Sequence, residues 1–98
     1  MAKKTRKYVI VRTYSAGCFA GHLAKREGKE VELNECRRLW SWRGAKTLSE
    51  LAVVGTADPK NCRFSVPTPT HLVTEAIEVI DATAGGEASI KGVPEWKN

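Results

Sequence analysis

The chain has 98 residues, of which 42% are hydrophobic and 28% charged, with a net charge of +5. These values are typical of one small folded domain and exclude a globally disordered chain. The basic charge favours an anionic partner, and so short a chain buries only a modest core, so we expect a homo-oligomer.

The N-terminus is rich in lysine and arginine, and we predict a flexible basic arm at residues 1–7 before a single β-rich domain at 8–98. The apolar run at 8–11 is too short for a signal-peptide core or a membrane span. The three cysteines are widely spaced, with no CxxC pair and no histidine at zinc-ligand spacing. We therefore expect a cytoplasmic protein with free thiols, no membrane association, no metal and no other cofactor.

The first half of the chain reads as strands. β-branched and aromatic residues predict a strand over 8–13, and a second is predicted over 18–24 with a bend or bulge at Gly21. A charged turn follows. Polar and apolar residues then alternate from Glu30 onward, which is typical of a half-buried strand, and we expect a bulge at 34–35.

One helix is well marked. The spacing of Thr47 and Glu50 predicts a capping box, in which each side chain accepts a hydrogen bond from the other residue's amide. Leucine and alanine supply an apolar stripe over 47–54, and Gly55 is a suitable stop. The sequence thus predicts a short helix inserted between strands.

The second half is less regular. A short strand is predicted over 62–66, and two prolines then break the chain. Residues 70–82 fit a helix or a strand, and we favour a strand over 75–82. One helical turn is expected near 87–91, and Trp96 is predicted to cap the core. The predicted fold class is α+β and mainly β: a small, strongly bent antiparallel sheet or a small barrel with one short helix.

The segment 37–44 places two of the three tryptophans and three arginines close together. Trp40 and Trp42 are two residues apart, so on a strand they share one face. Such a pair predicts a stacking platform for a base. The alternative is that one or both pack into the core or a subunit interface, which aromatic residues dominate.

The arginines of this segment suit phosphate, because a guanidinium group forms forked hydrogen bonds with its oxygens. Adjacent Arg37 and Arg38 point to opposite faces of a strand, so we expect Arg38 alone to join Arg43 in one site. The alternative is that these arginines are solvated or paired with nearby glutamates. Tyr14, beside a glycine turn, completes the predicted ligand-binding set.

No enzymatic motif is present in the sequence. His22 and His71 have no partners arranged as a triad or a metal site, and no phosphate-binding glycine loop occurs. Acidic residues alternate with apolar ones, as on a solvated strand face. We therefore predict a binding module that is not an enzyme and has no catalytic residues.

Part of the chain resembles a known class of small barrels. Residues 17–33 follow the pattern Gly-x-Phe-x-Gly-x-Leu, a charged turn, then Val-x-Leu. This resembles the second and third strands of Sm-like and other SH3-like small barrels, with 76–80 as the closing strand, and implies that architecture.

A second pattern runs through most of the chain: Tyr14-Ser15-Ala16-Gly17, Phe19-Ala20-Gly21, Arg37-Arg38-Leu39-Trp40, and Ser49-x-Leu51-Ala52 after Gly44-Ala45. With this pattern the chain resembles small uncharacterised proteins encoded by tailed bacteriophages. That resemblance implies a phage origin and a role against host defence.

The leading hypothesis is a phage-encoded, non-enzymatic module that sequesters an anionic nucleotide-type ligand in the host cytoplasm and antagonises defence signalling. One alternative is a nucleic-acid-binding protein, in which the basic arm and the arginines follow a phosphate backbone. Another is a protein-interaction surface that inhibits a host protein or serves phage assembly, since tryptophan and arginine are frequent interface hot spots.

Overall fold

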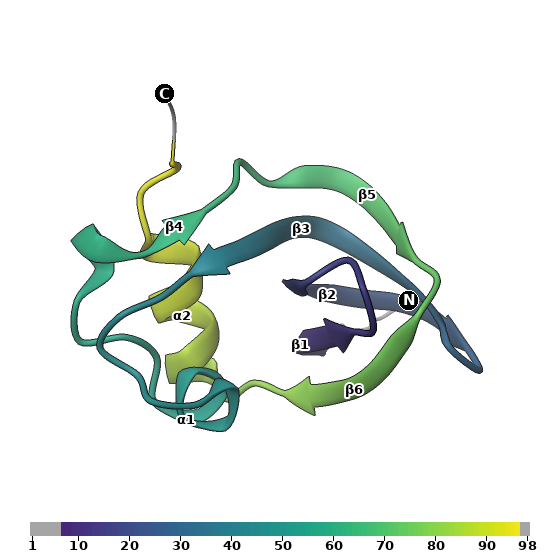
Figure 1. Ribbon diagram of the computed structural model, residues 1–98, viewed down its shortest axis with the longest axis horizontal. Helices are drawn as coiled ribbons and strands as arrows, with labels where there is room; N and C mark the ends of the chain where they lie inside the picture. Colours follow the sequence, from purple (N-terminus) through teal and green to yellow (C-terminus); the bar gives the residue numbers. More distant parts are fainter. Residues whose placement is uncertain (1–6, 97–98) are drawn as a thin grey trace, which may run out of the picture.

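The computed structural model describes residues 7–96 as a mainly antiparallel β structure with two short helices (Figure 1). The sheet order is β4-β3-β2-β1-β6, and β5 also pairs with β3, on the side that β4 occupies. All pairings between these strands are antiparallel. The strands are β1 (Tyr8–Thr13), β2 (Cys18–Glu27), β3 (Glu30–Ser41), β4 (Arg63–Phe64), β5 (Thr68–Val73) and β6 (Ala76–Asp81).

Strand β1 lies inside the sheet and is buried on both faces. Tyr8 and Ile10 belong to one buried cluster, whereas Val9 and Val11 belong to a second cluster. Because successive side chains of a strand point to opposite faces, a strand covered on both sides needs an unbroken apolar run. The apolar start of the domain therefore follows from the position of β1 between two cores.

The two helices cover one face of the sheet (Figure 1). Helix α1 (Leu48–Val53) and helix α2 (Ala84–Gly92) contribute Leu51 and Ile90 to the cluster that contains Tyr8 and Ile10. A short 3-10 helix, Pro59–Asn61, precedes β4. The other cluster is formed by strand residues alone, including Phe19 and Leu33.

The sheet curls, so that its outer strands β5 and β6 follow each other through only Thr74 and Glu75 (Figure 1). The expected bulges accompany this curvature. The register of β2 on β3 shifts around Gly21, where a Cβ atom would lie 3.0 Å from the carbonyl oxygen of Asn34. Glu35 has a φ of 50°, the left-handed conformation that a bulge residue adopts.

Several predicted elements are confirmed, including the strands over 8–13 and 75–82 and the helix at 47–54. The capping box is wrong in one detail. Thr47 Oγ1 accepts from the Glu50 amide at 3.1 Å, but the Glu50 carboxylate accepts from the amide of Lys46 at 3.0 Å instead of from that of Thr47.

The prediction for the second half is wrong at two places. Strand β5 was missed because Pro69 argued against it. Among the described residues this strand pairs with β3 alone, and an edge strand tolerates a residue without an N–H. Helix α2 has nine residues instead of one turn, so residues 7–96 contain two α-helices where one was predicted. Gly86 weakens the helix signal, yet a Cβ atom there would lie 1.9 Å from the carbonyl oxygen of Ala52 on the neighbouring helix α1.

Residues 1–6 of the predicted arm lie outside the described residues, and Lys7 is exposed with its amine 3.4 Å from the carboxylate of Asp81. Within residues 7–96, no helix has the length and apolarity needed to cross a membrane.

Candidate ligand-binding pocket

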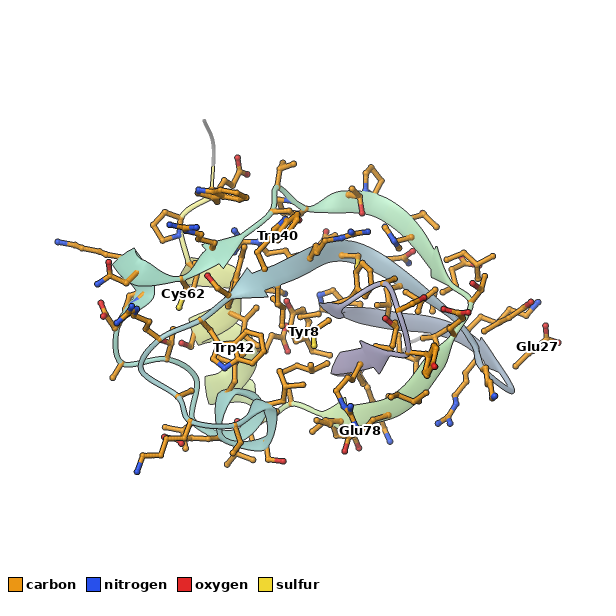
Figure 2. The ribbon with its side chains drawn as sticks, viewed as in Figure 1. Tyr8, Glu27, Trp40, Trp42, Cys62 and Glu78 are labelled. Carbon is orange, nitrogen blue, oxygen red and sulfur yellow. The ribbon has the colours of Figure 1, made fainter. Side chains whose placement is uncertain are left out.

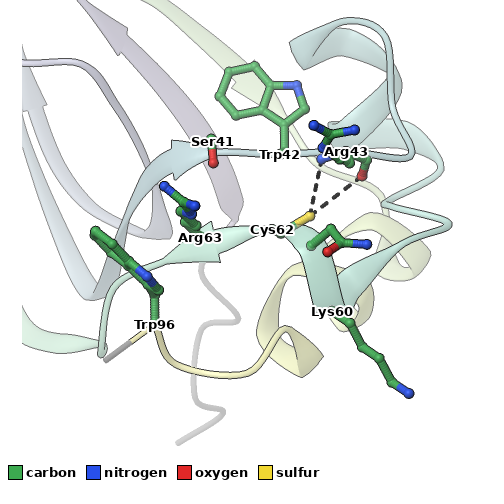
Figure 3. A pocket seen from close by; sticks show the side chains of 8 residues that line it. Ser41, Trp42, Arg43, Lys60, Cys62, Arg63 and Trp96 are labelled. Carbon is green, nitrogen blue, oxygen red and sulfur yellow. Dashed lines mark hydrogen bonds between the residues drawn. The ribbon is translucent and has the colours of Figure 1, made fainter. Parts of the chain in front are cut away.

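A hollow of about 810 Å³ opens beside the C-terminal end of β3. This volume lies within the range of about 300–1,000 Å³ that small-molecule pockets occupy. Its walls come from parts of the chain that are distant in sequence: the end of β3, the 3-10 helix, β4 and the segment after α2 (Figure 3). The lining residues are Ser41, Trp42, Arg43, Lys60, Asn61, Cys62, Arg63 and Trp96.

Hydrogen bonds hold the Arg43 side of the pocket in place. The Arg43 amide donates to Cys62 Sγ at 3.4 Å, and the thiol lies 3.5 Å from the Arg43 carbonyl oxygen (Figure 3). That carbonyl also accepts from Thr56 Oγ1, which itself accepts from the Asp58 amide at 2.9 Å. The loop that carries Trp42 and Arg43 is thereby fastened to the loop before β4.

Trp96 forms the opposite side of the pocket. Its backbone amide donates to the Phe64 carbonyl at 2.9 Å, which fixes the chain after α2 against β4. The Arg63 guanidinium lies over the Trp96 ring, 5.4 Å from the centroid, within cation–π range. Trp96 is 43% exposed and lies outside both buried clusters, so the expectation that it caps the core was wrong.

The pocket is positively charged. Arg43, Lys60 and Arg63 line it together with no acidic side chain, and within residues 7–96 none of the three forms an ion pair with a carboxylate. The neighbouring carboxylate of Asp58 accepts from Asn61 Nδ2 at 2.8 Å, which occupies one of its oxygens. A hollow with two indole rings and three such cations suits a planar, anionic guest.

The residues of the predicted ligand-binding set do not all line one pocket in the structure. Trp42 and Arg43 line this pocket, whereas Arg38 and Trp40 line a second hollow of about 350 Å³. Tyr14 is 81% exposed and lines neither of these two hollows.

The prediction that Trp40 and Trp42 share one face was wrong. Trp40 is 61% exposed, whereas Trp42 is half-buried and packs against the cluster that contains Leu39 (Figure 2). The register shifts between Leu39 and Ser41, and β3 ends at Ser41, so the simple alternation of faces stops between the two rings. The Trp40 ring instead meets Trp96 in a T-shaped contact, with centroids 5.9 Å apart.

Arg37 has a role that the sequence did not indicate. It points away from the face of Arg38, as expected, but it is not solvated, because its exposure is only 3%, and within residues 7–96 it forms no ion pair with Glu32 or Glu35. Its guanidinium group donates to carbonyl oxygens at the end of α2 and beside β4, which binds these elements together. The acceptors are Ser65 O, Ile90 O and Val93 O at 2.8 Å, and Phe64 O at 3.4 Å.

The sequence did not point to Lys60, Arg63 and Trp96 as members of the site. Each is far in the chain from the 37–44 segment, and only the pairing of β4 with β3 and the return of the chain after α2 bring them beside it. Of the three, only Trp96 carried a signal in the sequence, because a third tryptophan is a further candidate for stacking; no local pattern marked Lys60 or Arg63.

The structure also places two carboxylates beside His22, a proximity that the sequence did not reveal. His22 Nε2 lies 3.8 Å from Glu35 and 3.9 Å from Glu87, and its ring meets Tyr8 edge-on. Burial raises the pKa of Tyr8 above its usual value. Across the described part of the chain, no group of three His, Cys, Asp or Glu side chains is arranged to hold a metal ion.

The fold and the pocket together define a small antiparallel β protein with a basic, aromatic hollow at one end of its longest strand. The chain belongs to a family described as Domain of unknown function (DUF6948), whose sequence model matches residues 6–90. Most of the pocket lies within that match, and Trp96 lies beyond it. Comparisons with curated proteins and with solved structures gave no match.

Proposed function

We propose that this protein is a non-enzymatic binding module that holds an anionic, base-containing ligand, such as a nucleotide, in the pocket beside β3. The observation that carries the proposal is the composition of that pocket: two indole rings with Arg43, Lys60 and Arg63, and no acidic lining residue. A nucleotide combines the two features that such a lining favours, a flat aromatic base and phosphate charge.

The proposed binding mode assigns one role to each kind of side chain. The half-exposed ring of Trp96 stacks the base, a contact worth about 1–3 kcal/mol. The guanidinium groups of Arg43 and Arg63 form forked hydrogen bonds with phosphate oxygens, and Lys60 adds a point charge. Arg43 follows β3 and Arg63 lies on β4, so the two guanidinium groups reach the phosphate from different segments of the chain (Figure 3).

The wider role in this proposal is to hold the ligand instead of converting it. On the basis of the resemblance to tailed-bacteriophage proteins, we propose that this role is exercised in an infected host cytoplasm, where sequestering a nucleotide signal antagonises defence. We also propose that the curled sheet is a small barrel, as the resemblance to Sm-like and SH3-like barrels implies. A homo-oligomer also stays a prediction.

The proposal is tested by isothermal titration with AMP, ATP and inorganic phosphate. We expect ATP to bind more tightly than AMP, because additional phosphates meet additional cations. Arg63→Ala should weaken ATP about tenfold, which corresponds to about 1.4 kcal/mol. Arg26→Ala is the matched control, because Arg26 is an exposed arginine on β2 that does not line the pocket.

Two results would contradict the proposal. One is the absence of heat and of any thermal stabilisation with every nucleotide tested, since a ligand of the folded state must raise its stability by mass action. The other is an equal loss of affinity in Arg63→Ala and Arg26→Ala, which would show that binding follows net charge and not this pocket.

A further inference from the structure

A second hollow of about 350 Å³ lies near the pocket, on the face of β3 that carries Arg38 and Trp40. Its other wall is the turn between β1 and β2, where Gly17 has a φ of 97° and leaves open space on its Cα. Arg38 stands over the Phe19 ring, 4.8 Å from the centroid, and forms no ion pair within residues 7–96. Like the larger pocket, this hollow is therefore lined by an indole ring, that of Trp40, and by a cation without an ion-pair partner among the described residues, that of Arg38.

The two hollows are joined by aromatic rings. Trp40 lines the second hollow and Trp96 lines the first, and their rings meet with centroids 5.9 Å apart. The backbone between them is the last part of β3. Arg38 and Ser41, which line one hollow each, are separated by about 10 Å at 3.3 Å per strand residue. A stacked nucleic-acid strand advances by about 3.4 Å per nucleotide, so the distance of about 10 Å between the two hollows is greater than the rise of one nucleotide.

We propose that the ligand of this site is a short single-stranded oligonucleotide that spans both hollows. The inference rests on the proposed function and names the ligand class of the same site. One base stacks on Trp96 in the first hollow and another on Trp40 in the second. Arg63 and Arg43 bind phosphate at one end, and Arg38 binds a phosphate further along the strand.

Exposed rings favour a single strand over a duplex. Trp40 and Trp96 are 61% and 43% exposed, so their free faces and edges are available to a guest. In a duplex the base faces are already stacked and closed to side chains, whereas unpaired bases stack on aromatic rings with little regard to sequence. A basic groove with interleaved aromatic rings is the usual arrangement of proteins that bind single strands.

The test measures affinity against ligand length. The probes are 5′-phosphorylated deoxythymidylates and deoxyadenylates, from the mononucleotide upward, titrated against the full chain by isothermal calorimetry at several salt concentrations. We expect affinity to rise at least about tenfold once the strand reaches the second hollow, since each stacked base contributes about 1–3 kcal/mol.

Two variants test whether the gain in affinity with strand length comes from the second hollow. Arg38→Ala should leave the affinity for the mononucleotide within about twofold of the parent protein, and Arg38→Ala and Trp40→Ala should each reduce the affinity for the longer strands about tenfold. Arg38→Ala should also lower the slope of log K against log salt by about 0.7, the value for one phosphate of a single strand. Arg26→Ala again serves as the control and should change neither quantity.

The outcomes separate the two proposals. Mononucleotide binding with no gain at greater length overturns the oligonucleotide ligand and leaves the proposed function standing. A length gain that persists fully in both variants overturns the assignment of the second hollow. A self-complementary duplex bound as tightly as the single strand contradicts stacking as the basis of recognition. No binding of any probe refutes both proposals.

Discussion

Replacing Arg37 with methionine tests whether one buried guanidinium group holds the C-terminal part of the chain against the sheet. Arg37 donates to four backbone carbonyls. The carbonyls of Ile90 and Phe64 also accept a hydrogen bond from a backbone amide, and they retain that bond in the variant. The carbonyls of Ser65 and Val93 lose the donor that the structure shows for them. Arg37→Met therefore leaves one buried acceptor, the Val93 carbonyl, and one part-buried acceptor, the Ser65 carbonyl, without that partner.

The expected magnitude follows from these two acceptors. A buried group that loses its partner costs about 1–3 kcal/mol, and the part-buried Ser65 carbonyl costs less because water reaches it, so the free energy of unfolding should fall by about 1–4 kcal/mol. For a domain of this size a change of 1 kcal/mol shifts the Tm by about 4–8 °C, so a loss of about 2 kcal/mol lowers the Tm by about 8–16 °C. Urea denaturation followed by far-UV circular dichroism measures the free energy directly.

Arg38→Met is the matched control. This neighbour points to the other face and contacts the Phe19 ring without a buried hydrogen bond, so its loss should cost only about 0.5–1 kcal/mol. If Arg37→Met is no less stable than Arg38→Met, then the hydrogen bonds of Arg37 do not stabilise the fold and the reasoning is refuted. Since the same anchored segment carries Trp96, we also expect Arg37→Met to weaken ligand binding.

Two further predictions concern stability. Gly86→Ala should destabilise the protein by about 1–3 kcal/mol or more, because its Cβ would lie 1.9 Å from Ala52 O. The control Gly92→Ala meets no atom within 4 Å and should be neutral or stabilising by up to about 1 kcal/mol. Equal effects of the two substitutions in thermal unfolding would refute the close helix packing. Burial raises the pKa of Cys36 to about 12, so the unfolded chain releases this proton at lower pH than the folded one, and the free energy of unfolding should fall as the pH rises from 9 towards 12. Alkaline urea titrations should show a shallower fall in Cys36→Ala, and an unchanged slope would contradict the assignment.

Local elements could be read from the sequence wherever one short-range rule dominates. The apolar run at 8–11 predicted a strand, and Thr47 predicted a helix start, because side-chain alternation and capping depend on neighbours along the chain. Gly55 ended that helix for the same reason, with a φ of 89° that favours glycine. These features need no knowledge of the remaining fold.

Elements with conflicting local signals were decided by long-range pairing. Pro69 argued against a strand, but β5 lies at an edge of the sheet where its missing N–H costs little. Gly86 argued against a helix, but the small residue lets α2 approach the backbone of α1. In both cases the position of the element in the fold outweighed its intrinsic preference.

In the candidate site, too, some features follow from the local sequence and others from long-range packing. The sequence by itself determined that Trp42 and Arg43 stand together at the end of a strand, since two adjacent residues cannot be separated by folding. Only the tertiary structure decided that Arg37 is buried, that Trp40 turns away from Trp42, and that Arg63 and Trp96 complete the pocket. The physical reason is that burial and the closure of a pocket depend on which distant segments pack together, and no local pattern records that.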